Sequence, residues 1–179
     1  MLEARRRITS VSNKLWVFAH IQTDGKGRRG RVWIDPVGNF ASTCVFFPKT
    51  TIDKFALSSF TAALSLYDSL DYFSQSKANI SIKWPNDILL NGKKVAGILL
   101  ETIAVGQNKV ALSIGFGVNL LSYPETSELE ESAFSPTSFI SETGVTLDPI
   151  NLLKNLALNF SNYEGTLKAK GFSELRNIL

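Results

Sequence analysis

The sequence predicts one α+β domain, close to the α/β class, in which helices pack on a mixed β-sheet. Short segments rich in β-branched and aromatic residues are interspersed with two longer segments whose apolar residues recur at helical spacing. An Asn-Gly pair between apolar runs indicates at least one tight β-hairpin. Because strands and helices are intermixed and 179 residues suit one domain with a sizeable core, we expect a single domain over residues 1–179.

The first half of the chain alternates between predicted helices, strands and one long loop. Residues 3–12 are charged and compatible with a short helix, and residues 15–22 have the composition of a strand. Residues 23–37 are rich in glycine and arginine, which predicts a loop. A second strand is expected over residues 39–47, and residues 52–73 have the apolar spacing of a long amphipathic helix.

The middle of the chain contains the clearest hairpin. Residues 80–83 form a short predicted strand that ends before a Trp-Pro pair, since proline lacks a backbone donor. The apolar runs 88–90 and 93–102 flank Asn91-Gly92, which suits a type I′ turn because both central residues need positive φ. Residues 109–118 form a further predicted strand.

The last part is predicted to be helical after an irregular acidic stretch over residues 122–136. Residues 137–143 are compatible with a short helix that a glycine ends. Asp148 is the expected N-cap of the last helix and Pro149 its first residue, and the helix is expected to run to about residue 168.

Composition and single residues exclude several classes of protein. A net charge of +3 does not require a nucleic-acid partner, and no apolar stretch has the length of a membrane span. With one cysteine, Cys44, no disulfide can form within the chain, which favours a cytoplasmic location. We interpret Cys44 as a small buried hydrophobic residue and the only histidine, His20, as structural, so catalysis by a Ser-His or Cys-His pair is not expected.

Three motifs carry the chemistry. The first is Gly25-Lys26-Gly27-Arg28-Arg29-Gly30-Arg31, followed by Trp33. Its glycines allow close approach to a ligand and its arginines suit phosphate oxygens, but it matches neither the Walker loop nor the dinucleotide-binding fingerprint. A solvated basic turn remains the alternative.

The second motif is KWPND at residues 83–87, and the third is KKVAGIL at residues 93–99. The second motif places a basic residue, an aromatic residue and two polar side chains between two short strands, which is unusual for a surface turn because a tryptophan is costly to leave in water. The alternative to a functional role is a hairpin corner with a packed tryptophan. In the third, a glycine inside a strand indicates close approach of a ligand or backbone, and the preceding lysine suits a phosphate.

Taken together, these motifs resemble the biotin protein ligase family, also called biotin–acetyl-CoA-carboxylase ligases. The three motifs occur in the family's order and spacing, and IGFGVN at residues 114–119 is similar to its glycine-containing strand that ends in Asn. The resemblance is close over residues 15–119 and looser over residues 138–179.

The resemblance implies the fold of the biotin and lipoate protein ligase catalytic domain. It also implies a ligase that makes biotinyl-5′-AMP from biotin and ATP, with Mg²⁺ as activator, and transfers biotin to a lysine of a biotin carboxyl carrier protein of acetyl-CoA carboxylase. No tightly bound prosthetic group, DNA or membrane is expected, and the protein is expected to be a monomer or a weak homodimer.

Site residues follow from the resemblance, position by position. Implied catalytic residues are Arg28, Arg31 and Lys94. Implied biotin-binding residues are Gln22, Gly25, Lys26, Gly27, Lys94 and Gly97. Implied ATP- and adenylate-binding residues are Arg28, Arg31, Trp33, Lys83, Trp84, Asn86, Asp87 and Asn119. No metal ligand is assigned beyond Asp87 as a supporting residue for Mg²⁺.

The chain departs from the family's pattern in three places. The family's Ser-Thr segment, which precedes the first helix, is not found upstream of residue 4, so its hydroxyls are expected to be missing. Neither the helix-turn-helix domain of some relatives nor the SH3-like domain of many is expected, which predicts a monofunctional catalytic domain.

The residue types suit adenylation. A carboxylate must approach the α-phosphate of ATP, and fixed Lys and Arg donors screen the repulsion between these two anions. No general base is needed because a carboxylate of this kind is already ionised at pH 7.

Three alternatives stay open at this point. A lipoate or octanoate protein ligase or transferase would share the fold and attach a carboxylic acid to a lysine. An inactive biotin-site remnant would fit the missing Ser-Thr segment. A basic nucleic-acid-binding module would use the arginines at residues 5–7 and 28–31.

Overall fold

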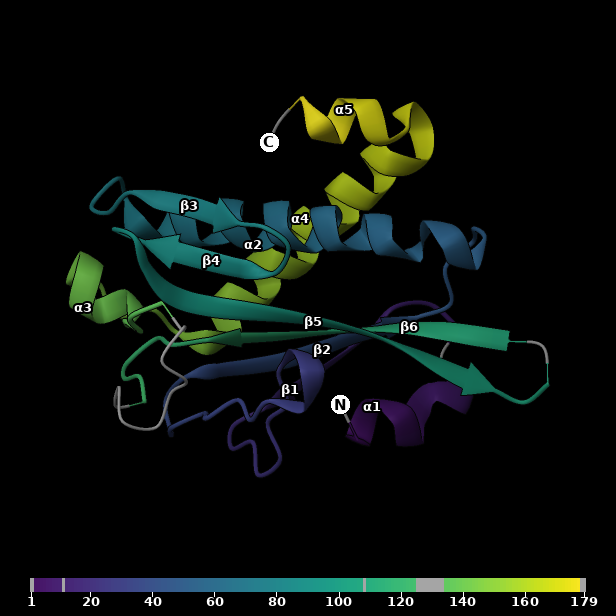
Figure 1. Ribbon diagram of the computed structural model, residues 1–179, viewed down its shortest axis with the longest axis horizontal. Coiled ribbons are helices and arrows are strands. Elements are labelled where there is room, and N and C mark those ends of the chain that lie inside the picture. Colours follow the sequence, from purple (N-terminus) through teal and green to yellow (C-terminus); the bar gives the residue numbers. More distant parts are fainter. Residues whose placement is uncertain (1, 11, 108, 125–133, 178–179) are drawn as a thin grey trace.

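The structure, a computed structural model, describes residues 2–10, 12–107, 109–124 and 134–177. These residues form a six-stranded sheet in the spatial order β1-β2-β6-β5-β4-β3, which twists across the molecule (Figure 1). The strands are β1 (Leu15–Ala19), β2 (Phe40–Phe46), β3 (Ile80–Lys83), β4 (Asp87–Leu90), β5 (Lys93–Val105) and β6 (Lys109–Val118).

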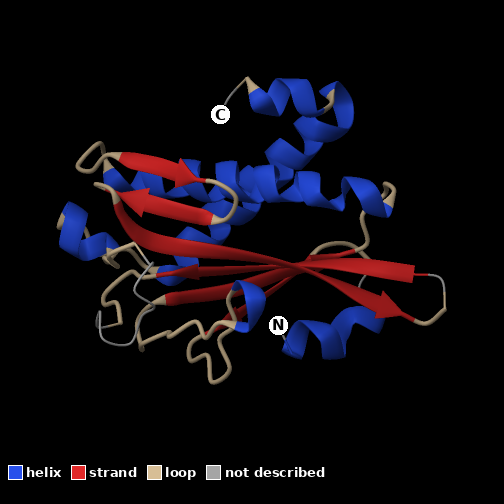
Figure 2. Ribbon diagram, in the orientation of Figure 1, coloured by secondary structure: helices blue, strands red, loops and turns tan. Residues whose placement is uncertain are grey.

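The helices are divided between the two faces of this sheet (Figure 2). The α-helices are α1 (Leu2–Arg7), α2 (Ser58–Ser74), α3 (Phe139–Thr143), α4 (Pro149–Lys170) and α5 (Phe172–Arg176). Short 3₁₀ turns lie at η1 (Ile8–Ser10), η2 (Arg28–Gly30) and η3 (Ile52–Leu57). Helices α2 and α4 pack against each other on one face, over the larger core, and α1 lies on the other.

The side chains of β2 show how one sheet serves two cores. Phe40 and Cys44 point into the larger core under α2 and α4, whereas Val45 points into a smaller cluster with Ala4 and Ile8. Successive side chains of a strand face opposite sides, so β2 contributes alternately to the two clusters. The rest of the α1 face is open, and this is where the candidate site lies.

The α+β class is confirmed, but the expectation of a mixed sheet is wrong in one respect: all five pairs of named strands are antiparallel. The reason is the path of α2. Instead of returning the chain to a parallel neighbour of β2, α2 leads it to the far edge, where β3 pairs only with β4. In the described residues, parallel pairing is limited to an isolated bridge between Lys94 and Pro136.

The local predictions hold best where a turn or a cap determines them. Asn91 and Gly92 have φ values of 49° and 79°, which confirms the predicted turn. Asp148 caps α4 by accepting a hydrogen bond from the Asn151 amide at 2.8 Å, and Pro149 is the first residue of that helix. The first strand is shorter than predicted and residues 52–57 are a 3₁₀ turn rather than the start of α2.

Part of the irregular stretch that was expected over residues 122–136 lies outside the described residues. Among the described helices, none is both long enough and apolar enough to cross a bilayer.

Candidate active site

A cavity of about 920 Å³ opens on the α1 face of the sheet. Its floor is formed by glycines on two paired strands, because Gly97 of β5 lies opposite Gly117 of β6 and both line the cavity. Its walls come from the loop after β1, the corner between β3 and β4, and residues 134–136. The volume is that of a site for a small organic ligand.

The indole of Trp33 lies directly on this glycine floor. A methyl group at Gly117 would come within 2.5 Å of Trp33 Cε2, and one at Gly97 within 3.0 Å of Cζ3. Gly117 therefore has no room for a side chain and Gly97 has little, so that the flat ring can approach the backbone of the sheet. The motif residue Trp33 and the two strands are thus parts of one structure, although they are far apart in sequence.

Backbone hydrogen bonds shape the glycine-arginine loop. The Gly27 amide donates to the Arg31 carbonyl at 2.8 Å, and the Trp33 amide donates to the Gly25 carbonyl at 2.9 Å. Arg29 at the tip has a left-handed conformation, with φ 58°. A Cβ at Gly25 would lie 2.1 Å from the Trp33 carbonyl oxygen, so a side chain cannot be accommodated there.

The two central cations meet the KWPND corner. Arg28 Nη1 donates to Asn86 Oδ1 at 3.1 Å, and Lys94 Nζ lies 2.8 Å from Asp87 Oδ1. The register of β4 and β5 explains the second pair, because it sets Leu89 opposite Lys94 and Asp87 two residues away along β4. Arg28 and Lys94, which are 66 positions apart, line the same cavity.

The Lys94–Asp87 contact has the distance of an ion pair but not the alignment of a hydrogen bond. Asp87 Oδ1 is buried and has no aligned donor among the described residues, although Lys94 Nζ is within 2.8 Å. Lys94 also lies 5.6 Å above the Trp33 ring. The Lys94 ammonium therefore lies between a carboxylate and an aromatic face, inside the cavity that an anionic ligand would enter.

The other predicted residues are placed around this centre. Lys83 Nζ lies 3.5 Å from the Phe134 ring centroid, and Trp84, about half exposed, stacks on Phe60 at 4.0 Å. Asn119 is buried at the end of β6, where its side-chain amide donates to the Thr137 carbonyl at 3.1 Å.

All but one of the predicted site residues line the cavity: Gln22, Lys26, Gly27, Arg28, Arg31, Trp33, Lys83, Trp84, Asn86, Asp87, Lys94, Gly97 and Asn119. Gly25 does not line the cavity. Its missing side chain allows the loop backbone to pack against the backbone of Trp33. Lys26 points to Asp24 at 3.4 Å, at the mouth of the loop.

Sequence reasoning missed several residues of the cavity. Gly115 and Gly117 form part of its floor, and glycines inside a predicted strand are the signal that points to such a close approach. Phe134 and Pro136 also line it, and no sequence signal distinguishes them from ordinary loop residues.

The titratable groups give no sign of nucleophilic catalysis. Burial raises the pKa of the Cys44 thiol, so Cys44 is an inert core residue, as predicted. His20 is exposed and its ring contacts the edge of Phe18. Burial also raises the pKa of Asp35 to about 6, next to the wall formed by Trp33 and Ile34. In the part of the chain that the structure describes, no three His, Cys, Asp or Glu residues gather as metal ligands.

The fold and the site define a member of the biotin/lipoate A/B protein ligase family, and the chain belongs to that family, whose sequence model matches residues 1–119. More particularly, the chain is 44% identical to the biotin–[acetyl-CoA-carboxylase] ligase of Paracoccus denitrificans, in an alignment that covers 98% of this chain and 73% of that protein.

Other relatives agree. The chain is 30% identical to the bifunctional ligase/repressor BirA of Bacillus subtilis over 89% of its own length, and spans about half (49%) of that relative. Among solved structures, the biotin protein ligase from Aquifex aeolicus in complex with biotin and ATP is similar with a TM-score of 0.77 and 25% identity, covering 97% of this chain and 71% of that one. The predicted family and fold are confirmed.

Proposed function

We propose that this protein is a biotin ligase, which forms biotinyl-5′-AMP from biotin and ATP and transfers the biotin to a lysine of a biotin carboxyl carrier protein. The observation that carries the proposal is the convergence of Arg28, Lys94 and the KWPND corner on one glycine-floored cavity. The 44% identity to a biotin ligase over nearly the whole chain supports biotin over lipoate as the acid.

In this proposal biotin lies over the Trp33 indole, which covers the glycine floor of the cavity. The flat indole suits an apolar bicyclic ring and chain, since ligand pockets are mainly apolar with a few polar groups. Gln22, Lys26 and Gly27 lie at the loop end, where they would meet the polar end of the ring.

The adenylate occupies the side of the KWPND corner. Arg28 and Arg31 supply the positive charge for the phosphate. Trp84, which is about half exposed, offers an aromatic surface to the adenine base. Lys83, Asn86, Asp87 and Asn119 surround the same end of the cavity.

In the first step a biotin carboxylate oxygen attacks the α-phosphorus of ATP. A bond forms between that oxygen and phosphorus, the bond to the bridging oxygen of the β-phosphate breaks, and pyrophosphate leaves with the electron pair. Lys94 and Arg28 lower the repulsion between the two reacting anions, because preorganised cations stabilise charge that gathers on phosphate oxygens.

In the second step the neutral amine of the acceptor lysine attacks the carbonyl carbon of biotinyl-AMP. An amide bond forms, the bond between the carbonyl carbon and the phosphate oxygen breaks, AMP leaves, and the proton of the attacking nitrogen passes to solvent. Closure of the glycine-arginine loop over the cavity would keep water away from the mixed anhydride, and the glycines at positions 25, 27 and 30 allow that movement.

Asp87 is the residue that would support magnesium in this proposal, because Mg²⁺ is often held by one protein carboxylate together with substrate phosphates. Its buried Oδ1 has no aligned hydrogen-bond donor among the described residues but lies 2.8 Å from Lys94 Nζ, so Lys94 would have to turn toward the phosphate for the ion to approach. When bound, the ion would neutralise the pyrophosphate leaving group.

The acceptor protein, the monomeric or weakly dimeric state, the cytoplasmic location and the single-domain organisation over residues 1–179 stay predictions.

The proposal is tested by incubating the protein with MgATP and biotin, lipoate or octanoate in parallel, and measuring the adenylate that forms with each acid. We expect biotinyl-AMP in large excess. Lipoyl-AMP without biotinyl-AMP would overturn the choice of acid, and no adenylate from any of the three would support the inactive remnant.

A further inference from the structure

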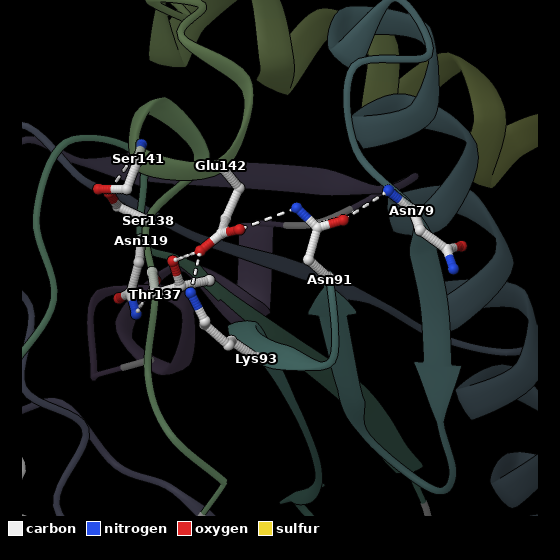
Figure 3. Close-up of polar contacts among 8 residues, drawn as sticks. All are labelled: Asn79, Asn91, Lys93, Asn119, Thr137, Ser138, Ser141 and Glu142. Carbon is white, nitrogen blue, oxygen red and sulfur yellow. Dashed lines mark hydrogen bonds and ion pairs between the residues drawn. The ribbon is translucent and has the colours of Figure 1, made fainter.

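A network of polar side chains is centred on Glu142 of α3 (Figure 3). The Glu142 carboxylate accepts hydrogen bonds from Thr137 Oγ1 at 2.6 Å, Asn91 Nδ2 at 2.8 Å and Lys93 Nζ at 2.9 Å. Asn91 in turn accepts a hydrogen bond from the Asn79 amide, just before β3. The carboxylate therefore joins the β4–β5 turn to the segment that precedes α3.

Thr137 connects this network to two of the proposed site residues. Its amide donates to the Lys94 carbonyl at 2.9 Å, and its carbonyl accepts from the Asn119 side chain at 3.1 Å. The Lys94 amide donates to the Ser135 carbonyl at 2.9 Å, so the backbone of Lys94 is held on both sides by the same short segment. Thr137 is thus a bridge between Lys94 on β5 and Asn119 at the end of β6.

The segment is fixed at its other end as well. The Phe139 amide donates to the Asn119 carbonyl at 2.8 Å, which ties the start of α3 to the end of β6. The Glu142 side chain is only 10% exposed, and its hydrogen bonds, that of Thr137 foremost and then that of Asn91, lower the pKa of its carboxyl to about 2. Glu142 is therefore a charged, fully engaged acceptor at any physiological pH.

Glu142 does not itself line the cavity, whereas Lys94 and Asn119 do. The hydrogen bonds that Asn91 and Lys93 donate to Glu142 would by themselves connect the β4–β5 turn to α3. The additional bond to Thr137 reaches a residue whose backbone contacts both Lys94 and Asn119.

We propose that Glu142 is a positioning residue for adenylate formation, which acts through Thr137 and the β4–β5 turn to fix Lys94 relative to Asn119. This inference rests on the proposed function for its catalytic consequence. The structural part of the proposal, that the network holds Lys94 in place, can be tested without any ligand.

The variants change the network at its two central side chains, Thr137 and Glu142. Thr137→Val removes the hydroxyl and keeps the shape and both backbone contacts, whereas Thr137→Ser retains the hydroxyl and serves as the conservative rescue. Glu142→Gln removes the charge and one acceptor. The matched control is Tyr163→Phe, which removes a hydrogen bond to Asp68 between α4 and α2, away from the cavity.

The first measurement is the single-turnover rate of biotinyl-AMP formation, with the Kd of biotin measured separately. We expect Thr137→Val and Glu142→Gln to slow the rate at saturating biotin at least about tenfold, with a Kd within about threefold of the wild type, because a small misplacement of reacting groups costs rate more than binding. Thr137→Ser and Tyr163→Phe should stay within about threefold of the wild-type rate.

The second measurement needs no substrate. Each folded protein is treated with an amine-acylating ester, and the modification of Lys94 is followed by mass spectrometry relative to exposed Lys77. We expect Lys94 to react several-fold faster in Thr137→Val and Glu142→Gln than in the wild type, Thr137→Ser or Tyr163→Phe, because its contact with Asp87 is loosened.

The outcomes separate the two proposals. Unchanged Lys94 reactivity in both variants overturns the inference, and so does an equal loss of rate in the Tyr163→Phe control. If the wild type forms no biotinyl-AMP while Lys94 reactivity rises as expected, the positioning role stands and the proposed function fails.

Discussion

The contact between Trp33 and the glycine floor allows a graded test by single methyl groups. An alanine Cβ at Gly117 would lie 2.5 Å from the indole, so the ring or the strand must move by roughly 1 Å to reach ordinary contact. At Gly97 the gap is 3.0 Å and a shift of a few tenths of an ångström suffices. Overpacking of this kind costs about 1–3 kcal/mol, and we expect Gly117→Ala at the upper end and Gly97→Ala at or below the lower.

The assay combines thermal unfolding with calorimetry of biotin binding for Gly117→Ala, Gly97→Ala and Gly165→Ala. Gly165 in α4 has open space where an alanine methyl group would lie, so its variant should be slightly more stable than the wild type, by about 0.5–1 kcal/mol, with unchanged biotin affinity. A displaced indole enters the space proposed for biotin, so Gly117→Ala should weaken biotin binding at least about tenfold, which corresponds to about 1.4 kcal/mol. Wild-type stability and affinity in Gly117→Ala would refute the described packing of Trp33.

Three further predictions concern charged groups. Arg28→Ala should speed the release of biotinyl-AMP at least about tenfold, with little change in Tm, and an unchanged off-rate would exclude the phosphate role. Glu142→Gln should lower the free energy of unfolding at pH 7 by about 1–3 kcal/mol. The difference should fade as pH drops from 4.5 toward 2, since the stabilisation from a lowered pKa is fully present above the unfolded value and is lost as pH falls to the folded one; denaturant titrations that show a constant difference would contradict this. Asp35→Asn should raise the free energy of unfolding by about 1–2 kcal/mol above pH 6 and leave it unchanged below about pH 4. The reason is that burial raises the Asp35 pKa to about 6 and penalises only the charged form of the carboxyl. Equal free energies of unfolding for the variant and the wild type at pH 8 would contradict this prediction.

Features that depend on neighbouring residues were predictable from the sequence. The turn at Asn91-Gly92 requires two positive φ values, and this pair of residues adopts them readily. The start of α4 follows from an aspartate cap and a proline in the first turn. These signals are local, so no knowledge of the tertiary structure is needed to interpret them.

The antiparallel sheet was not predictable in the same way. Its order depends on the edge to which α2 delivers the chain, and no local pattern in residues 58–74 specifies that edge. The short helix α5 was also missed, because its five residues carry too little periodicity to identify it.

The candidate site likewise combines residues that local motifs identify with contacts that depend on the folded chain. Motif residues such as Arg28 and Lys94 were identified in advance, and the structure brings both to one cavity. The docking of Trp33 on Gly117 and the hydrogen bond from Thr137 to Glu142 depend on strand register and on the position of α3, which only the folded chain determines.

The central claim is that Lys94 screens the repulsion between the biotin carboxylate and the α-phosphate during adenylation. The most direct measurement compares single-turnover rates of biotinyl-AMP formation in the wild type, in Lys94→Ala and in the surface control Lys154→Ala. We predict a loss of about 100-fold or more for Lys94→Ala, as for removal of a preorganised donor in other enzymes, and no change for the control. A Lys94→Ala rate within twofold of the wild type would contradict this role of Lys94.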